Sequence, residues 1–178
     1  MKKNILYYLS MLQINKAKRA RLLLKSYIKE GMTVGDNVHF YSTITIGEPY
    51  LVKIGDNSTI ANNVALITHD ASIGALFDRS IYSDLCGRIT IGRNSFIGYN
   101  SIILYGVSLA DYTVVAAGSV VTKSFNQSNI IIGGNPARII GSAEQYKEKY
   151  KDNFLKLHGL NPSTKKKIIL DSKKLVEK

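Results

Sequence analysis

The sequence predicts a mainly β protein, in which a column of about four stacked triangular coils lies between two helical segments. Two observations lead to this fold class. Apolar residues recur at every sixth position through the glycine-rich middle of the chain, and both ends carry Lys and Arg among apolar residues at helical spacing. A helix would space its apolar residues by three and four, and an ordinary strand would alternate throughout, so neither explains a period of six.

Residues 1–31 are predicted to form a helical cap on the column. Apolar residues between positions 4 and 29 occur at mixed spacings of three and four, with Lys and Arg at the other positions. A stack of parallel coils exposes unpaired strand edges at its ends, so a helical cover is expected there. The apolar stretch over residues 5–12 is too short for a membrane span, which needs about 20 residues.

Residues 32–140 contain the six-residue repeat and are predicted to form the column. Three repeats close one coil, with one flat side each, so twelve repeats make about four coils. Gly or Ala often follows the inward apolar residue, and a small or β-branched residue four positions after it fits the crowded corner. The inward positions are Val34, Phe40, Ile46, Ile54, Ile60, Leu66, Ile91, Ile97, Ile103, Leu109, Val115 and Val121.

Two interruptions break the period. An apolar step of eight residues predicts a small bulged corner around Glu48. A second step, from Leu66 to Ile91, is 25 residues long, so about residues 70–88 are predicted to leave the column as an excursion loop. Loops that leave a rigid scaffold often carry functional residues, which draws attention to His69 at the root of this one.

Residues 141–178 are predicted to form a C-terminal helix and a basic tail. The helix is expected over residues 142–158, with Ser142 as its N-cap and Gly159 past its end. The remaining residues are rich in Lys and include a short apolar run, which leaves a tail and a further short helix as alternatives.

The net charge of +11 comes entirely from the two flanks. Residues 1–30 carry eight basic and one acidic side chain, residues 31–140 carry six and seven, and residues 141–178 carry ten and five. No basic stripe follows the repeat, so no nucleic-acid partner is expected. The flanks fit better either an anionic membrane surface, which would mean peripheral membrane association, or phosphate groups of a bound ligand. One cysteine and no secretory cleavage signal favour a cytoplasmic protein, placed at the inner face of the membrane if the flanks bind there.

Three sequence features together resemble the hexapeptide-repeat acyltransferases, and most closely their sugar and capsular-polysaccharide O-acetyltransferase branch. They are the repeats, the loop rooted at Thr68-His69-Asp70, and a closing pair of motifs, AGSVVTK over 117–123 and GNPAR over 134–138. The resemblance implies a left-handed parallel β-helix, a homotrimer with active sites between neighbouring columns, acetyl-CoA as the donor and a saccharide acceptor. It implies no metal.

His69 is the candidate general base. Moving an acetyl group from a thioester to a hydroxyl needs a group that takes the hydroxyl proton, and histidine, with a pKa of about 6.5, suits this role. The imidazolium can then return the proton to the leaving thiolate. Asp70 is expected to orient the ring, although neighbouring strand residues face opposite ways, and Glu48 is the second candidate for this task.

The binding residues are carried over from the resemblance. Two residues near the first coil, Tyr41 and Glu48, are expected to contact the acceptor. Lys123 and Arg138 are expected to bind the phosphate groups of the donor. The expected donor-binding residues are Tyr99, Ala117, Thr122, Lys123 and Arg138.

Two other functions remain open at this point. N-acetylation of an amino sugar or a nucleotide sugar would use the same base. A catalytically silent column used for assembly would release no thiol from acetyl-CoA. A zinc-dependent carbonic anhydrase of the same fold is disfavoured, because the three histidines include no HxxxxH pair.

Overall fold

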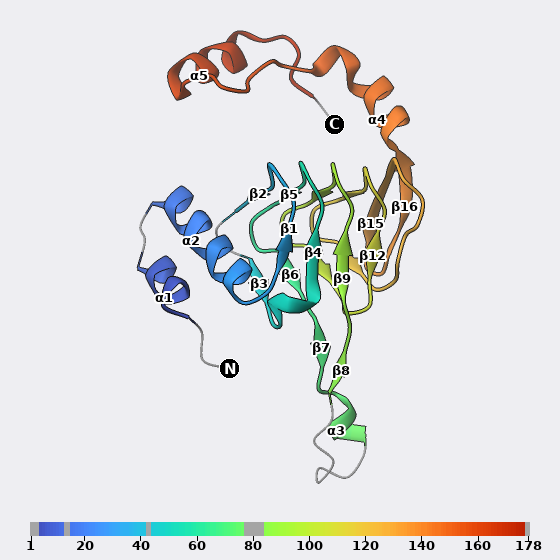
Figure 1. The fold of residues 1–178 in the computed structure, drawn as a ribbon. Helices are drawn as coiled ribbons and strands as arrows, with labels where there is room; N and C mark the ends of the chain where they lie inside the picture. Colours follow the sequence, from blue (N-terminus) through green and yellow to red (C-terminus); the bar gives the residue numbers. More distant parts are fainter. Residues whose placement is uncertain (1–3, 13–14, 42–43, 77–83, 177–178) are drawn as a thin grey trace. The chain divides into compact units, whose positions relative to one another are not determined.

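The computed structural model describes residues 4–12, 15–41, 44–76 and 84–176 (Figure 1). The chain divides into two compact units, Met1–Gly141 and Ser142–Lys178. The first unit contains the N-terminal helices together with the coils. The second unit contains the C-terminal helices and is described by itself below.

The column consists of three sheets that surround one core, and the strands of successive coils pair in parallel (Figure 1). Sheet A contains β1 (Thr33–Val34), β4 (Val52–Ile54), β9 (Ile89–Ile91) and β12 (Ser108–Leu109). Sheet B contains β2 (His39–Phe40), β5 (Thr59–Ile60), β10 (Phe96–Ile97), β13 (Val114–Val115), β15 (Ile130–Gly134) and β16 (Ala137–Ser142). Sheet C contains β3 (Thr45–Ile46), β6 (Ala65–Leu66), β11 (Ile102–Ile103) and β14 (Val120–Val121). The chain visits the three sheets in turn and completes four coils, which confirms the predicted left-handed parallel β-helix.

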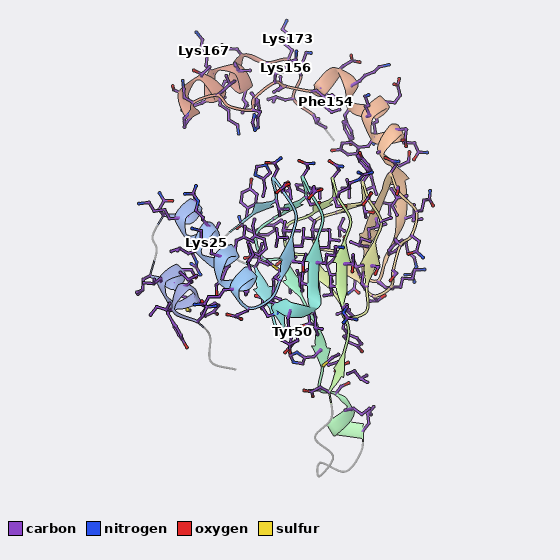
Figure 2. The ribbon with its side chains drawn as sticks, viewed as in Figure 1. Lys25, Tyr50, Phe154, Lys156, Lys167 and Lys173 are labelled. Atoms are coloured by element: carbon purple, nitrogen blue, oxygen red, sulfur yellow. The ribbon has the colours of Figure 1, made fainter. Side chains whose placement is uncertain are left out.

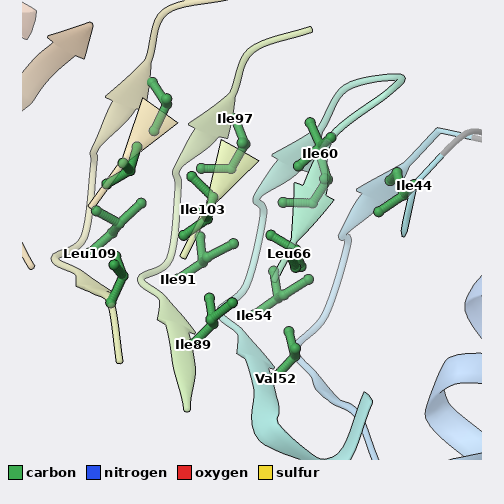
Figure 3. Close-up of a cluster of buried hydrophobic side chains, with 14 of the residues drawn as sticks. Ile44, Val52, Ile54, Ile60, Leu66, Ile89, Ile91, Ile97, Ile103 and Leu109 are labelled. Carbon is green, nitrogen blue, oxygen red and sulfur yellow. The ribbon is translucent and has the colours of Figure 1, made fainter. Parts of the chain in front are cut away.

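The core is a ladder of aliphatic side chains inside the column (Figure 3). Equivalent residues of successive coils stack in register, as Ile97 does on Ile60 and Val115 on Ile97. Eleven of the twelve predicted inward residues are buried, and Val34 in the first coil is partly buried against them. Each fully buried aliphatic side chain contributes roughly 1.5–3 kcal/mol of transfer free energy, so this ladder is the main hydrophobic contribution to folding.

Eight of the described corners lie at the third position after an inward residue. There the backbone adopts positive φ, and Asn or Gly fills most of the described corners, because these residues tolerate the left-handed region. Tyr112 occupies the same position with φ of 58°. Such a side chain adopts this conformation at a cost in free energy. The Asn and Gly corners are Asn37, Asn57, Asn63, Asn94, Asn100, Gly106 and Gly118.

Two helices cover the first coil: α1 (Ile5–Met11) and α2 (Lys16–Lys29). Each begins at an asparagine whose side chain accepts hydrogen bonds from amides of the first turn. Tyr27 of α2 is buried, its hydroxyl donates to the Ile44 carbonyl oxygen at 2.9 Å, and its ring packs edge-on against Phe40. These contacts attach the helices to the open end of the core.

Both interruptions of the repeat lie at the edge between sheet C and sheet A. The first is the turn η1 (Pro49–Leu51), between β3 and β4. At the second, the chain leaves as an antiparallel ribbon of β7 (His69–Asp70) and β8 (Leu85–Cys86), followed outward by α3 (Ile73–Leu76). Residues 77–83 of the predicted loop lie outside the described residues. The loop is closed at its root, where the Gly87 amide donates to the Thr68 carbonyl oxygen at 2.9 Å.

The C-terminal unit contains α4 (Ala143–Tyr150), η2 (Lys151–Asn153) and α5 (Pro162–Asp171). Ser142 and Gln145 form a capping box at the start of α4, as the sequence predicts for Ser142. The helix is shorter than the predicted range, and part of the predicted tail is helical. Asn161 caps α5 by accepting from the Thr164 amide at 2.9 Å, and Pro162 fits the first helical position.

Candidate active site

The candidate site lies at the edge between sheets C and A, where the two interruptions stack. Glu48 belongs to the bulge of the first coil, and His69 begins the excursion of the second. Ile46 pairs with Leu66, so residues 20 positions apart are neighbours at this level of the column. Glu48 therefore lies beside Thr68. Within the described parts of the chain, no group of three or more His, Cys, Asp or Glu residues is placed to hold a metal ion.

His69 and Glu48 form a hydrogen-bonded pair. The His69 Nδ1 atom lies 2.8 Å from Glu48 Oε2, with 42% of the histidine side chain and 22% of the glutamate side chain exposed. This hydrogen bond and the negative charge of Glu48 raise the pKa of His69 above its ordinary value. When Nδ1 donates to the carboxylate, Nε2 is the nitrogen that can accept a proton.

Thr68 holds the Glu48 carboxylate. Its buried hydroxyl donates to Glu48 Oε2 and accepts from the Glu48 backbone amide at 2.9 Å. Gly47 leaves space for this arrangement, since a Cβ at this position would lie 2.9 Å from Thr68 Oγ1 and 3.2 Å from His69 Nδ1. Neither Thr68 nor Gly47 was predicted to have a role in the site. The 20-residue offset between Glu48 and Thr68, which stack on successive coils, is the sequence signal from which both roles could have been predicted.

Asp70 points away from the His69 ring and makes other contacts. Its carboxylate accepts from the Ser72 amide at 2.8 Å and from the Tyr105 hydroxyl at 3.1 Å. These hydrogen bonds hold the pKa of Asp70 below its ordinary value. Successive residues of β7 face opposite sides, so adjacency in sequence separates the two side chains. The carboxylate beside His69 is therefore Glu48, and not Asp70 as the sequence analysis preferred.

Tyr99 and Ala117 lie at a different edge, between sheets B and C. They stack on successive coils, because the Gly118 amide donates to the Tyr99 carbonyl oxygen at 2.8 Å. The Tyr99 hydroxyl accepts from Asn63 Nδ2 at 2.8 Å. Tyr41, which was predicted to contact the acceptor, follows β2 at this same edge. Within one chain, the structure does not bring these residues to His69.

Lys123 and Arg138 line one cavity of about 430 Å³, together with Phe125. The ammonium of Lys123 lies 5.7 Å from the centre of the Phe125 ring, and Arg138 Nη1 donates to the Ala137 carbonyl oxygen at 3.0 Å. Thr122 is exposed beside Lys123. Thr122 and Lys123 follow β14 at the same edge as His69, two coils further along the column. The structure thus brings the two predicted cations together.

Comparison with known sequences agrees with this architecture. Residues 52–67 and 88–123 match a family described as the hexapeptide repeat of succinyl-transferase. Over 146 residues the chain is 44% identical to protein CapG of Staphylococcus aureus, which covers 80% of this chain and 84% of that protein. It is 39% identical over 114 residues to galactoside O-acetyltransferase of Escherichia coli, 60% of this chain. The chain spans about half, 54%, of that second relative.

A solved structure is also similar along most of the chain. A galactoside acetyltransferase in complex with coenzyme A aligns with a TM-score of 0.62 and 28% sequence identity, and the alignment covers 80% of each chain. The repeat matches the family model, and a relative with 44% identity aligns over most of both chains. This protein therefore belongs to the hexapeptide-repeat acetyltransferase family.

Proposed function

We propose that this protein transfers the acetyl group of acetyl-CoA to a hydroxyl of a saccharide, with His69 as the general base. The observation that carries the proposal is the pairing of His69 Nδ1 with Glu48, at the edge where the column departs from its repeat. The similarity to a protein named galactoside O-acetyltransferase supports the saccharide acceptor. The similar solved structure in complex with coenzyme A supports the donor.

The chemistry of the pair suits direct transfer. Nδ1 donates to Glu48, so Nε2 takes the proton of the acceptor hydroxyl as that oxygen attacks the thioester carbonyl carbon. The ring then carries a positive charge beside the carboxylate, and the attraction that raises the pKa of His69 stabilises this state. Collapse of the tetrahedral intermediate breaks the carbon–sulfur bond. The imidazolium gives its proton to the thiolate, which leaves an acetyl ester, free coenzyme A and neutral His69.

The donor is proposed to run along the column towards Lys123 and Arg138. Coenzyme A carries phosphate groups, and two cations that share a cavity are suited to bind them. Tyr99 and Ala117 belong to the edge between sheets B and C, whereas His69 belongs to the edge between sheets C and A. A donor that contacts both sets therefore lies between two copies of the chain, which supports a homotrimer with its active sites between neighbouring columns.

The test is a thiol-release assay with acetyl-CoA and a panel of acceptors: mono-, oligo- and lipid-linked saccharides, with amino sugars as a separate arm. Release that depends on a hydroxyl acceptor is expected, and His69→Ala should lower kcat by about 10²–10⁴ without changing the melting temperature. The matched control is His158→Ala, an exposed histidine in the C-terminal unit. Thiol release with amino sugars alone would mean that the protein is an N-acetyltransferase and not an O-acetyltransferase. A His69→Ala variant with wild-type activity would remove the proposed base.

A further inference from the structure

The outer side of α1 is a continuous apolar stripe. Four of its residues have the spacing i, i+3, i+4, i+7, which places them on one side of a helix, and Met11 extends the same surface. Their exposed fractions range from 42% to 77%. The opposite side, which includes the buried Ser10, faces the rest of the protein. The residues of this apolar stripe are Ile5, Tyr8, Leu9, Met11 and Leu12.

Next to it, α2 exposes a basic stripe. Lys18, Arg21, Lys25 and Lys29 follow the spacing i, i+3, i+7, i+11, which is one side of a helix, and all four are exposed (Lys25 is labelled in Figure 2). The buried Tyr27 belongs to the opposite side, against the column. Long cationic side chains in such a row present their charges to whatever lies outside the helix.

Hydrogen bonds hold the start of α1 against the end of α2, so the two stripes belong to one helix pair. Asn4 Nδ2 donates to the Ser26 carbonyl oxygen at 3.1 Å and to Glu30 Oε1 at 2.7 Å, and Ser26 Oγ donates to Asn4 Oδ1 at 3.1 Å. Glu30 is the single acidic residue among residues 1–30. Its carboxylate is engaged on the inner side of the pair, so it does not neutralise the basic stripe.

We propose that this outer face of α1 and α2 binds an anionic lipid surface. Apolar and aromatic side chains enter the boundary between headgroups and acyl chains, and Lys and Arg beside them meet lipid phosphates. Nucleic acid would match the basic stripe and leave the apolar stripe exposed. A second copy of the chain would present the same positive charge, and the two faces would repel each other.

The binding is peripheral. No helix within the part of the chain that the structure describes is long and apolar enough to cross a bilayer. The apolar stripe covers one side of a seven-residue helix, which is enough to enter a lipid interface and too little to span it. This inference rests on the helix pair alone and is independent of the proposed acetyl transfer.

The experiment is co-sedimentation of the full-length protein with vesicles of phosphatidylcholine, and with vesicles that also contain phosphatidylglycerol. We expect binding to the anionic vesicles that weakens as ionic strength rises. Lys18→Gln/Lys25→Gln should weaken it by about 10- to 30-fold. The matched control, Lys147→Gln/Lys149→Gln in α4, removes the same charge from the other basic flank and should leave binding unchanged.

A third variant tests the apolar stripe separately. Leu9→Ser should reduce binding at every ionic strength, while circular dichroism and thiol release stay at wild-type levels. Equal partition of the wild-type protein onto both vesicle types would overturn the proposal, and so would equal losses in the α2 and α4 variants. Retained vesicle binding by Leu9→Ser, together with a changed sedimentation coefficient, would assign the stripe to a contact between copies of the chain.

Discussion

Replacement of Glu48 by Gln should lower kcat/KM while leaving the fold intact. The carboxylate accepts a hydrogen bond from His69 Nδ1 at 2.8 Å and one from the Thr68 hydroxyl. Gln has nearly the same shape and retains the backbone bond from the Glu48 amide to Thr68. The substitution therefore removes the negative charge beside the imidazole and little else.

The magnitude follows from the exposure of the pair. Loss of the carboxylate behind a deeply buried catalytic histidine costs about 10⁴ in rate. Here 42% of the His69 side chain and 22% of the Glu48 side chain are exposed, so solvent screens part of the interaction. A charge-assisted hydrogen bond in this setting is worth about a 10- to 100-fold change in kcat/KM.

The pH profile separates this role from a structural one. The proposed base, His69, acts in its neutral form, so activity should fall as the pH drops through its pKa. Glu48 raises that pKa, and the Gln variant should bring it back towards the ordinary value of about 6.5, which moves the acidic limb to lower pH. Asp70→Asn is the matched control and should not move the limb towards lower pH as far as Glu48→Gln does. The assignment of Glu48 as the orienting group would be refuted if the acidic limb of the pH profile did not shift in Glu48→Gln. It would also be refuted if both variants lost the same factor in kcat/KM.

Three further substitutions test other parts of the structure. Thr68→Val removes the hydroxyl that holds Glu48, and should lower kcat by about 3- to 10-fold in the thiol-release assay; a larger loss than in Glu48→Gln would contradict this order of roles. Ile97→Ala, at a fully buried core position, should lower the free energy of unfolding by about 2–5 kcal/mol in urea titrations, and a loss below this range would mean that the ladder repacks. Tyr112→Asn places a tolerant residue at a corner with φ of 58° and should raise the same free energy by about 0.5–1 kcal/mol; a decrease would show that the tyrosine side chain makes compensating contacts.

The column was predictable because one geometric requirement repeats along it. Every inward position must be apolar to fill the space between three sheets, so the period of six located residues such as Ile60 and Val115 directly. The corners were predicted less completely. The predicted pattern consisted of apolar residues and the small residues beside them, and it did not include the Asn or Gly at the third position, whose positive φ forms most of the corners. The structure decides between the two alternatives for the Lys-rich end in favour of a short helix, α5, whose start is marked by the Asn161 cap and not by an apolar pattern.

The candidate site was predictable only in part, because it depends on which residues stack. His69 was found from its place at the root of the loop. Its predicted partner, Asp70, is next to it in sequence, yet the side chains of neighbours along β7 face opposite sides, and Glu48, one coil earlier, contacts the His69 ring instead. The two extra residues of the first interruption change the coil step to 20, which moves Glu48 into line with Thr68. The proposed contribution of a second chain to donor binding depends on which edges of the column carry the binding residues, and the repeat alone does not indicate this.

Because the excursion is closed at its root, sequence changes in the excursion can occur independently of the coils. The Thr68 carbonyl and the Gly87 amide are joined, and Ile91 stacks on Ile54 as though the intervening residues were missing. Lengthening or exchanging the segment between them leaves the ladder in register, and loop length itself adds little entropic cost. The outer part of the excursion can therefore change in length or sequence while the coils and the histidine at its root keep their places.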